Sequence, residues 1–165
     1  MLKRLLLIMT ILISCVGCDQ ATKSIARTHL SETRAVSLMG GSVRLQLAKN
    51  YGAFLSIGAS MHEDTRSAIL SAGVATMLVV MFVYCLISTP GNPLVVPALA
   101  MVIGGGVSNL IDRLLHGGYV VDFLNLGVGS IRTGIFNVAD VFIMSGVLLL
   151  VAGDWLTKGM LKKHV

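Results

Sequence analysis

Long uncharged apolar stretches, separated by a few polar segments, make up most of this chain. No residue between Arg66 and Asp112 is charged, and a Thr-Pro-Gly-Asn-Pro turn at 89–93 divides this stretch in two. About 20 apolar residues cross a membrane as a helix, so each half is long enough to do so, and similar stretches lie near both ends of the chain. We therefore expect four transmembrane helices, over about 5–21, 67–88, 94–111 and 134–153.

The polar segment over about 27–66 is expected to form a loop outside the membrane. Within it, the residues from Val43 to Leu47 alternate between apolar and polar behind a Gly40-Gly41 turn, which is typical of a strand with one apolar face. We expect this strand to belong to a small sheet on the membrane surface. The chain, 1–165, is therefore predicted to be one mainly α-helical integral membrane domain with a small extracytoplasmic sheet.

The composition supports the membrane assignment. Of the 165 residues, 55% are hydrophobic and 13% are charged, and the mean hydropathy is +0.83, which is far more apolar than a soluble protein. The Lys and Arg residues behind the net charge of +5 are scattered singly, and 5% of residues are aromatic, which argues against nucleic-acid binding. Basic residues near both ends favour a cytoplasmic position for these ends. They are Lys3, Arg4, Lys158, Lys162 and Lys163.

The cysteines Cys15, Cys18 and Cys85 lie in apolar stretches with no histidine at metal-ligand spacing. We interpret them as small, buried hydrophobic residues without a disulfide. The stretch Leu12-Ile13-Ser14-Cys15 also has the form of a lipoprotein cleavage box behind a basic start. A cleavable signal peptide is therefore an alternative interpretation of the first span.

Acidic residues within or next to a membrane span are costly, and they therefore indicate function. The first and last spans are too short unless Asp19 and Asp140 are counted in them. With both ends cytoplasmic, Asp19 ends the first helix, Asp112 ends the third, and Asp140 begins the fourth, so all three face the outer side. The other polar residues expected on this side are Asp122, Asn50, Asn109 and Asn137.

Each acid also has a purely structural interpretation. Asp19 and Lys23 are one helical turn apart and could neutralise each other. Asn137 and Asp140 have the spacing of a capping box, and Asp112-Arg113 could form an ion pair at a helix end. A small proton-coupled carrier that uses the acids as a relay is a further alternative.

Two carboxyls held close together cannot both ionise easily, so one keeps a proton while the other acts as a base on a shared water. This is the chemistry of aspartic proteases, and we favour Asp122 and Asp140 as the pair. No Gly-x-Ser-x-Gly or His-Glu-x-x-His motif indicates another nucleophile or a zinc site. We therefore expect neither a metal nor an organic cofactor.

Five short motifs occur together in a characteristic order. They are DQATK at 19–23, NYGAFLS at 50–56, GGGVSNLIDR at 104–113, VVDF at 120–123 and FNVAD at 136–140. Together they resemble lipoprotein signal peptidase, also called signal peptidase II, a family of bacterial membrane aspartic peptidases. Ser108 stands where this family commonly has glycine.

The resemblance implies four transmembrane helices with a small β-cradle, and it implies that Asp122 and Asp140 are catalytic. The residues that it implies for substrate binding are Asn50, Asn109, Arg113 and Asn137. The residues that it implies as their support are Asp19, Lys23 and Asp112. Because DQATK follows the apparent cleavage box, the first apolar stretch is expected to be retained as a transmembrane helix.

The resemblance also implies a substrate and a location. The expected substrates are diacylglyceryl-modified bacterial prolipoproteins, cut immediately before the lipidated cysteine. The expected surroundings are the lipids of the bacterial cytoplasmic (inner) membrane, in which the protein is multi-pass and monomeric. Its active site is expected on the extracytoplasmic side.

Overall fold

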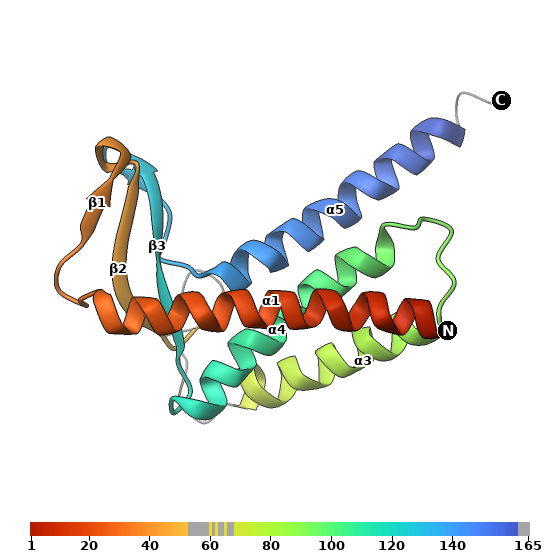
Figure 1. The fold of residues 1–165 in the computed structure, drawn as a ribbon, viewed down its shortest axis with the longest axis horizontal. Coiled ribbons are helices and arrows are strands. Elements are labelled where there is room, and N and C mark those ends of the chain that lie inside the picture. Colours follow the sequence, from red (N-terminus) through yellow and green to blue (C-terminus); the bar gives the residue numbers. More distant parts are fainter. Residues whose placement is uncertain (53–59, 61, 63–64, 66–67, 162–165) are drawn as a thin grey trace.

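In the computed structural model, the chain forms a bundle of helices that carries a small sheet at one end (Figure 1). The structure describes residues 1–165 except 53–59, 61, 63–64, 66–67 and 162–165. Within this part, four helices are long and apolar enough to cross a membrane: Leu2–His29, Ile69–Ile87, Val95–Leu115 and Val138–Trp155. The predicted fold class, a mainly helical membrane protein with a small sheet, is confirmed.

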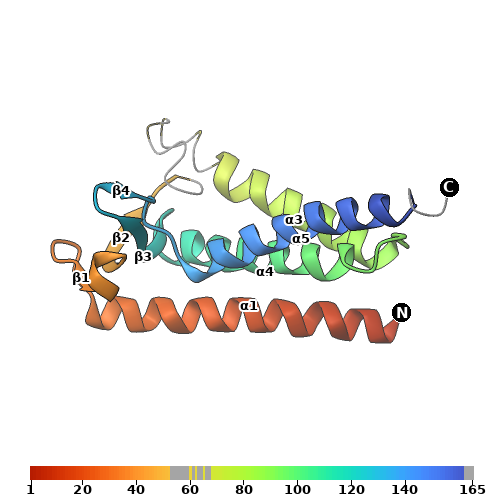
Figure 2. The same ribbon diagram turned by 90° about the horizontal axis from the view of Figure 1, so that it is seen from above.

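The sheet and the chain ends lie at opposite ends of the bundle. The helices are α1 (Leu2–His29), α3 (Val74–Ile87), α4 (Val95–Leu115) and α5 (Val138–Leu161), and a π-helical segment, η3 (Ala68–Gly73), leads into α3. The N-terminus and the end of α5 both lie at the end away from the sheet (Figures 1 and 2). The sheet and the chain ends therefore belong to opposite sides of a membrane that this bundle would cross.

Helix α1 is longer than the predicted span over 5–21, and Asp19 lies inside it. The prediction that Asp19 ends the first helix is wrong, because Lys23 follows one turn later and pairs with Asp19 at 2.6 Å. Neither side chain is exposed. The pair neutralises both charges inside the helix, so α1 continues to His29 without a break.

The cysteines divide into two buried residues and one exposed residue, and all three are free. Cys15 and Cys85 are buried, as expected, whereas the expectation is wrong for Cys18. The buried residues of α1 form one stripe along the helix: Ile8, Cys15, Asp19, Lys23 and Ala26. Cys18 lies off this stripe and is exposed.

Four antiparallel strands form the sheet in the order β1-β2-β3-β4. They are β1 (Val36–Leu38), β2 (Val43–Asn50), β3 (Val120–Val128) and β4 (Ile131–Arg132). The predicted strand over 43–47 is part of β2, and the turn before it contains Gly40 with a φ of 65°, which glycine adopts without strain. β2 pairs with β3 so that Asn50 lies opposite Val120, and this register brings Asn50 next to Asp122.

Helix α4 lies at the centre of the bundle, because three consecutive glycines let a different helix approach on each side. A Cβ atom on Gly104 would lie 2.7 Å from a side-chain carbon of α1. On Gly105 it would lie 2.5 Å from a backbone oxygen of α5, and on Gly106 2.6 Å from Leu78 of α3. The interpretation of these glycines as sites of close helix packing is confirmed.

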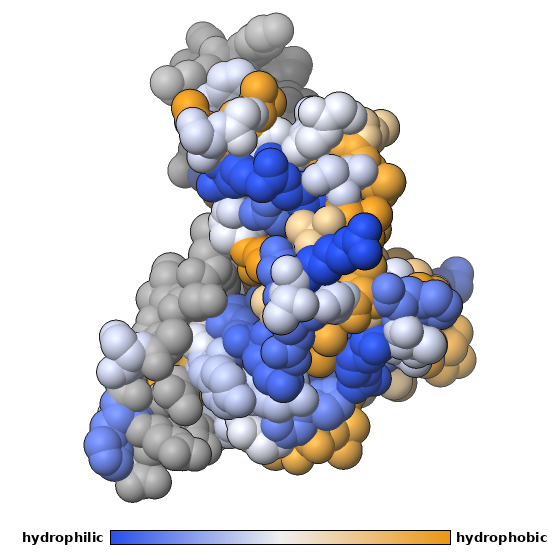
Figure 3. All heavy atoms as spheres, turned by 90° about the vertical axis from the view of Figure 1, so that its left-hand side faces the viewer, coloured by the Kyte–Doolittle hydropathy of each residue, from blue (hydrophilic) through white to orange (hydrophobic). Residues whose placement is uncertain are grey.

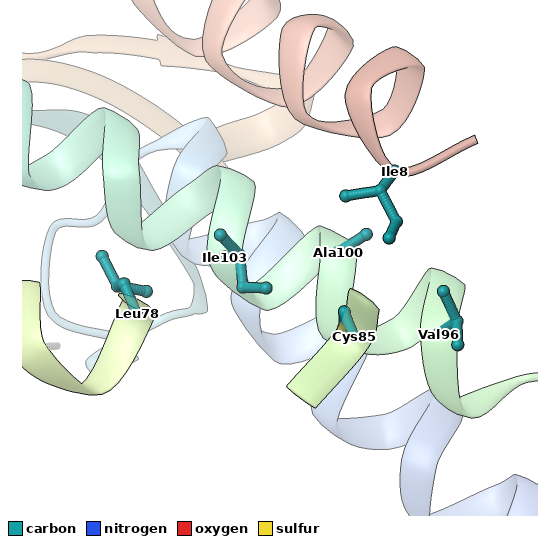
Figure 4. Close-up of a cluster of buried hydrophobic side chains, with 6 residues drawn as sticks. All are labelled: Ile8, Leu78, Cys85, Val96, Ala100 and Ile103. Atoms are coloured by element: carbon teal, nitrogen blue, oxygen red, sulfur yellow. The ribbon is translucent and has the colours of Figure 1, made fainter. Parts of the chain in front are cut away.

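A hydrophobic cluster fills the space between α1, α3 and α4. Its buried members are Ile8, Leu78, Cys85, Val96, Ala100 and Ile103 (Figure 4). Close packing of this kind holds membrane helices together, since lipid is as apolar as the side chains themselves. The cluster thereby holds α1 and α4, which carry buried polar residues toward their other ends.

Candidate active site

Asp122 and Asp140 are buried at the end of the bundle that carries the sheet, where hydrophilic residues gather at the surface (Figure 3). Asp122 belongs to β3 and is 1% exposed, and Asp140 lies in the first turn of α5 and is 4% exposed. A buried carboxyl is costly unless donors surround it. The Asp122–Asp140 pair therefore depends on the polar groups that the neighbouring elements supply.

Two amide groups hold Asp122. Asn50 Nδ2 donates to Asp122 Oδ2 at 2.8 Å, and Asn137 Nδ2 donates to Asp122 Oδ1 at 2.6 Å. Asn50 ends β2, and Asn137 directly precedes α5. Each carboxyl oxygen of Asp122 thus has its own donor, from a different part of the fold.

A path of amides joins Asp122 to Asp140. Besides Asp122, Asn137 Nδ2 donates to Asn109 Oδ1 at 3.1 Å. Asn109 Nδ2 in turn donates to Asp140 Oδ1 at 3.0 Å. The structure therefore brings together the two acids and the three asparagines that the sequence predicted for the outer side.

The surroundings of Asp122 favour its protonated form. Burial raises the pKa of Asp122 from its ordinary value of 3.8 to about 7, and the charge of Asp140 adds to this effect. The hydrogen bonds from Asn50 and Asn137 lower the pKa in part. Near neutral pH, Asp122 therefore keeps its proton in a large share of molecules.

Lys23 forms a second buried layer behind the pair. Its ammonium group lies 2.6 Å from Asp19 Oδ2 and 3.0 Å from Asp112 Oδ2, and all three side chains are 0% exposed. Lys23 Nζ also donates to Asn109 Oδ1 at 2.9 Å. The three N–H bonds of one lysine thus serve two carboxylates and the amide that contacts Asp140.

Asp19 and Asp112 also hold the backbone beside the catalytic candidates. The N–H of Ala139 donates to Asp19 Oδ1 at 2.8 Å, and the N–H of Val121 donates to Asp112 Oδ2 at 2.9 Å. Each of these N–H groups belongs to the residue directly before one acid of the pair. Asp19 and Asp112 therefore fix the two backbone segments that carry the pair.

Gln20 and Ser108 contact the same two acids, and the sequence did not single them out as site residues. Ser108 Oγ donates to Asp19 Oδ2 at 2.7 Å, and Gln20 Nε2 donates to Asp112 Oδ1 at 2.9 Å. Gln20 directly follows Asp19, and Ser108 directly precedes Asn109. Their position inside the motifs is the signal that could have identified them.

Arg113 supports the segment that carries Asn50. Arg113 Nη2 donates to the backbone oxygen of Gly52 at 2.8 Å, and the N–H of Gly52 donates to Asn50 Oδ1 at 2.9 Å. The side chain of Arg113 is 8% exposed. The remaining positions of the NYGAFLS motif, 53–56, lie outside the described residues.

Two apolar grooves reach Asp140 from different sides. A groove of about 260 Å³ lies between the sheet and α5, with Leu126, Phe136 and Met144 in its lining. A groove of about 170 Å³ lies between η3, α3, α4 and α5, and Asn109 and Arg113 line it together with apolar residues. Asp140 therefore lies at the wall of two mainly apolar grooves.

The arrangement is able to activate a water molecule. A protonated carboxyl beside an ionised one provides an acid and a base for the hydrolysis of a peptide bond. Among the described residues, no group of three or more His, Cys, Asp or Glu side chains could hold a metal ion. The chemistry that these residues support is that of an aspartic peptidase.

Comparison with known proteins leads to the same class. A family model described as "Signal peptidase (SPase) II" matches residues 11–156. The chain is 36% identical to a lipoprotein signal peptidase of Acinetobacter baylyi over 137 residues, which cover 80% of this chain and 72% of that protein. It is 39% identical to a lipoprotein signal peptidase of Sphingopyxis alaskensis over 136 residues, which cover 81% of this chain and 76% of that protein.

Two solved structures, each described as a bacterial membrane enzyme, have the same fold. One, at 2.3 Å resolution, matches with a TM-score of 0.78 and 24% identity, over 93% of this chain and 88% of that chain. The other, at 1.9 Å resolution, matches with a TM-score of 0.74 and 23% identity, over 88% of this chain and 90% of that chain. At these identities the likeness shows the fold alone.

Proposed function

This chain belongs to the signal peptidase II family of aspartic peptidases, and we propose that Asp122 and Asp140 are its catalytic pair. The observation that carries the proposal is the amide path from Asp122 through Asn137 and Asn109 to Asp140. The family processes the signal peptides of prolipoproteins. The proposed reaction is cleavage of a diacylglyceryl-modified prolipoprotein immediately before its lipidated cysteine.

The proposed reaction uses one water and the proton that the pair shares. The ionised carboxyl takes a proton from water as its oxygen attacks the scissile carbonyl, while the protonated carboxyl donates to the carbonyl oxygen. The tetrahedral intermediate then collapses and the C–N bond breaks. The carboxyl that took the proton from water gives it to the leaving amine, and the other carboxylate takes a proton from a hydroxyl of the intermediate. The pair ends with one proton, as it began, and requires no cofactor.

Polar groups around the pair suit a peptide bond at the membrane boundary. A bare peptide N–H or C=O in hydrocarbon costs several kcal/mol. Asn50, Asn109, Asn137 and Arg113 offer donors and acceptors at this depth, and each is at most 8% exposed. We assign them to the positioning of the scissile segment, with Asp19, Lys23 and Asp112 as their support.

The grooves that reach Asp140 suit a substrate that is itself part of the membrane. Their linings combine apolar side chains of α3, α4 and α5 with a few polar groups. An acyl-modified signal peptide presents apolar surface of this kind. Anchoring in the bilayer also holds the scissile bond at one height, which replaces a search in three dimensions by positioning along a plane.

The position of the sheet supports an extracytoplasmic site in the bacterial inner membrane. The sheet lies away from the chain ends (Figure 1), and Asp122 belongs to this sheet while Asp140 lies in the first turn of α5. The basic residues near the chain ends favour the cytoplasm for these ends. We therefore place the site on the outer side of a multi-pass, monomeric enzyme that is surrounded by membrane lipids.

The buried side chains favour a peptidase over a proton-coupled carrier. In the described part of the chain, the buried polar and charged side chains are Asp19, Lys23, Asn50, Ser108, Asn109, Asp112, Arg113, Asp122, Asn137 and Asp140. All of them lie in the half of the bundle next to the sheet. The other half is held by apolar residues such as Ile8, Cys85 and Val96, and none of the buried polar side chains described above lies there to relay a proton.

The test is cleavage by the purified protein in lipid vesicles. A diacylglyceryl-modified prolipoprotein and the unmodified precursor of the same sequence are incubated separately, and products are read by gel shift and mass spectrometry. We expect a product that begins at the lipidated cysteine, with the unmodified precursor cut poorly or not at all. Equal cleavage of both forms would contradict the proposed substrate, and no cleavage of either would contradict the proposed function.

A further inference from the structure

The carboxylates of Asp19 and Asp112 have matching sets of three donors. Each receives the Lys23 ammonium and one backbone N–H from the residue directly before a catalytic acid. The third donor is a neutral side chain: Ser108 Oγ for Asp19 and Gln20 Nε2 for Asp112. The symmetry indicates that the neutral donors serve the same purpose on both carboxylates.

Gln20 and Ser108 also contact each other, which makes them one unit. Gln20 Nε2 lies 3.0 Å from Ser108 Oγ, so the hydroxyl accepts from Gln20 while it donates to Asp19. A continuous chain of hydrogen bonds thus runs from Asp112 through Gln20 and Ser108 to Asp19. Gln20 and Ser108 are the two neutral side chains in this chain of hydrogen bonds.

Lys23 cannot by itself fix the orientation of the two carboxylates. An ammonium group is a compact charge with three equivalent donors, so it attracts a carboxylate without setting its rotation. A hydroxyl at 2.7 Å and an amide at 2.9 Å on defined oxygen atoms do set the rotation. That rotation decides where Asp19 Oδ1 and Asp112 Oδ2 meet the N–H groups of Ala139 and Val121.

We propose that Gln20 and Ser108 are positioning residues, which set the geometry of the Asp122–Asp140 pair by orienting Asp19 and Asp112. This inference rests on the proposed function, since it takes the pair to be catalytic. Neither residue touches the pair in the structure, so both act through the backbone N–H groups that the two supporting acids hold. A misplacement of about 1 Å, even one caused far from the reacting atoms, can lower a catalytic rate about a hundredfold.

The first test removes each neutral donor while Lys23 stays in place. Ser108→Ala deletes the hydroxyl, and Gln20→Met keeps the length of the side chain without its amide. With the lipidated prolipoprotein as substrate, we expect kcat to fall about tenfold in each variant and KM to stay within about twofold. The matched control is Thr28→Ala on the same helix, because Thr28 is exposed and its hydroxyl donates to the backbone oxygen of Ser24 within α1.

The double variant tests whether the two side chains act as one unit. Independent residues would multiply their effects to about a hundredfold loss, whereas a shared chain of hydrogen bonds gives a combined loss close to that of either single variant. Full multiplication would contradict the coupling of Gln20 to Ser108. Wild-type kcat in both single variants would overturn the proposal.

The second test uses a charge that can be switched. Gln20→Glu places a third carboxylate against Asp112 at high pH, but its protonated form donates an O–H as the amide does. The charged or titratable groups of the surrounding network are Asp19, Lys23 and Arg27 of α1, Asp112 and Arg113 of α4, His116 directly after α4, Asp122 of β3 and Asp140 of α5.

The readout is the activity of Gln20→Glu divided by that of Gln20→Met across the pH range. Division cancels the titration of the catalytic pair, which both variants share. We expect a ratio below one at pH about 8 that rises above one at pH about 5.5. The melting temperatures of both variants are measured at the same pH values, so that a loss of folded protein is separated from a loss of kcat. A ratio of kcat values that does not change with pH would contradict the inference.

The two proposals can fail separately. If Asp122→Asn remains active, the catalytic pair is wrong and the proposed function falls with it. If that variant is inactive while the Gln20 and Ser108 variants keep the wild-type kcat and a constant ratio, the pair stands and only the positioning role falls.

Discussion

Asn137 and Asp140 cap each other at the start of helix α5. The N–H of Asp140 donates to Asn137 Oδ1 at 2.9 Å, and the N–H of Asn137 donates to Asp140 Oδ2 at 3.3 Å. The capping-box spacing in the sequence is thereby confirmed. Since Asn137 also donates to Asp122, the cap and the proposed site share one residue, and the capping role of Asp140 is compatible with its proposed catalytic role.

Loss of either catalytic acid should abolish cleavage. We expect Asp122→Asn and Asp140→Asn each to lower the rate by about a thousandfold or more, because one half of the shared-proton pair is lost. Asparagine keeps the size of the side chain, so the protein should remain folded and inserted. The control is Asp154→Asn, an exposed acid on the same helix as Asp140. Residual activity near wild type in either variant would rule out the pair.

Activity should fall as pH rises above about 7. The pKa of Asp122 is raised by burial to about 7, and the pair needs one proton, so deprotonation of Asp122 above this value removes the acid. The measurement is the kcat for the lipidated precursor between pH 5 and 9. A rate that stays constant from pH 6 to 9 would disagree with a shared proton at this site.

The raised pKa of Asp122 also predicts how the stability of the folded protein changes with pH. The ordinary pKa of Asp122 is 3.8 and the folded value is about 7, so the folded state binds more protons between these values. Its contribution to stability is full below pH about 4 and is lost as pH rises through about 7. The wild-type melting temperature, compared with that of Asp122→Asn, should therefore rise on acidification from pH 8 to pH 4.

Replacement of Lys23 should destabilise the protein more than any exposed lysine. Lys23→Met leaves Asp19 and Asp112 buried without their shared cation, and removal of one partner of a buried ion pair costs about 3–5 kcal/mol. The control is Lys49→Met, since Lys49 pairs with Glu32 at an exposed position. Thermal unfolding in detergent measures both. Equal melting temperatures for the two variants would show that the buried ion pairs of Lys23 do not stabilise the protein more than the exposed pair of Lys49.

A methyl group on Gly105 should separate α4 from α5. The Cβ of Gly105→Ala would lie 2.5 Å from the backbone oxygen of Ala139, and overpacking of this kind costs about 1–3 kcal/mol. Because Ala139 precedes Asp140, activity should fall together with stability. Gly17→Ala in α1 is the matched control, since no atom lies within 4 Å of its added Cβ. Unchanged melting and activity in Gly105→Ala would contradict the close contact.

Chelators should leave the activity unchanged. Two carboxyls and a water suffice for peptide hydrolysis, and the described residues contain no cluster that could hold a metal ion. The measurement is cleavage after incubation with EDTA and dialysis, with the untreated protein as control. Complete inhibition that added zinc reverses would overturn the assignment to aspartic chemistry.

The features that the sequence predicted depend on the local composition of the chain and on the number of membrane spans. The uncharged run between Arg66 and Asp112 predicted two spans because charge is expensive in lipid, whatever the tertiary structure. Alternation from Val43 to Leu47 predicted a strand for the same local reason. With four spans, counting alone placed the acids and asparagines at one end of the bundle, and the structure has them there.

Contacts between distant segments could not be read from the sequence. The bond between the N–H of Ala139 and Asp19 depends on how α1 and α5 cross, and no local pattern records a crossing angle. The extent of α1 was misjudged because burial of Lys23 beside Asp19 removes the cost of the charges. The roles of Gln20 and Ser108 likewise emerge only when α1 and α4 lie side by side.

The packing of α1 against α4 also has a consequence for timing during biosynthesis. A chain made only as far as the Pro90 turn contains Asp19 and Lys23 but neither catalytic carboxyl. The stretch Leu12-Ile13-Ser14-Cys15, which has the form of a lipoprotein cleavage box, is therefore already in place as part of α1 before a working site exists. Once α4 is added, Cys15 lies buried against Gly104, so the cysteine of this stretch is covered by the neighbouring helix in the finished protein.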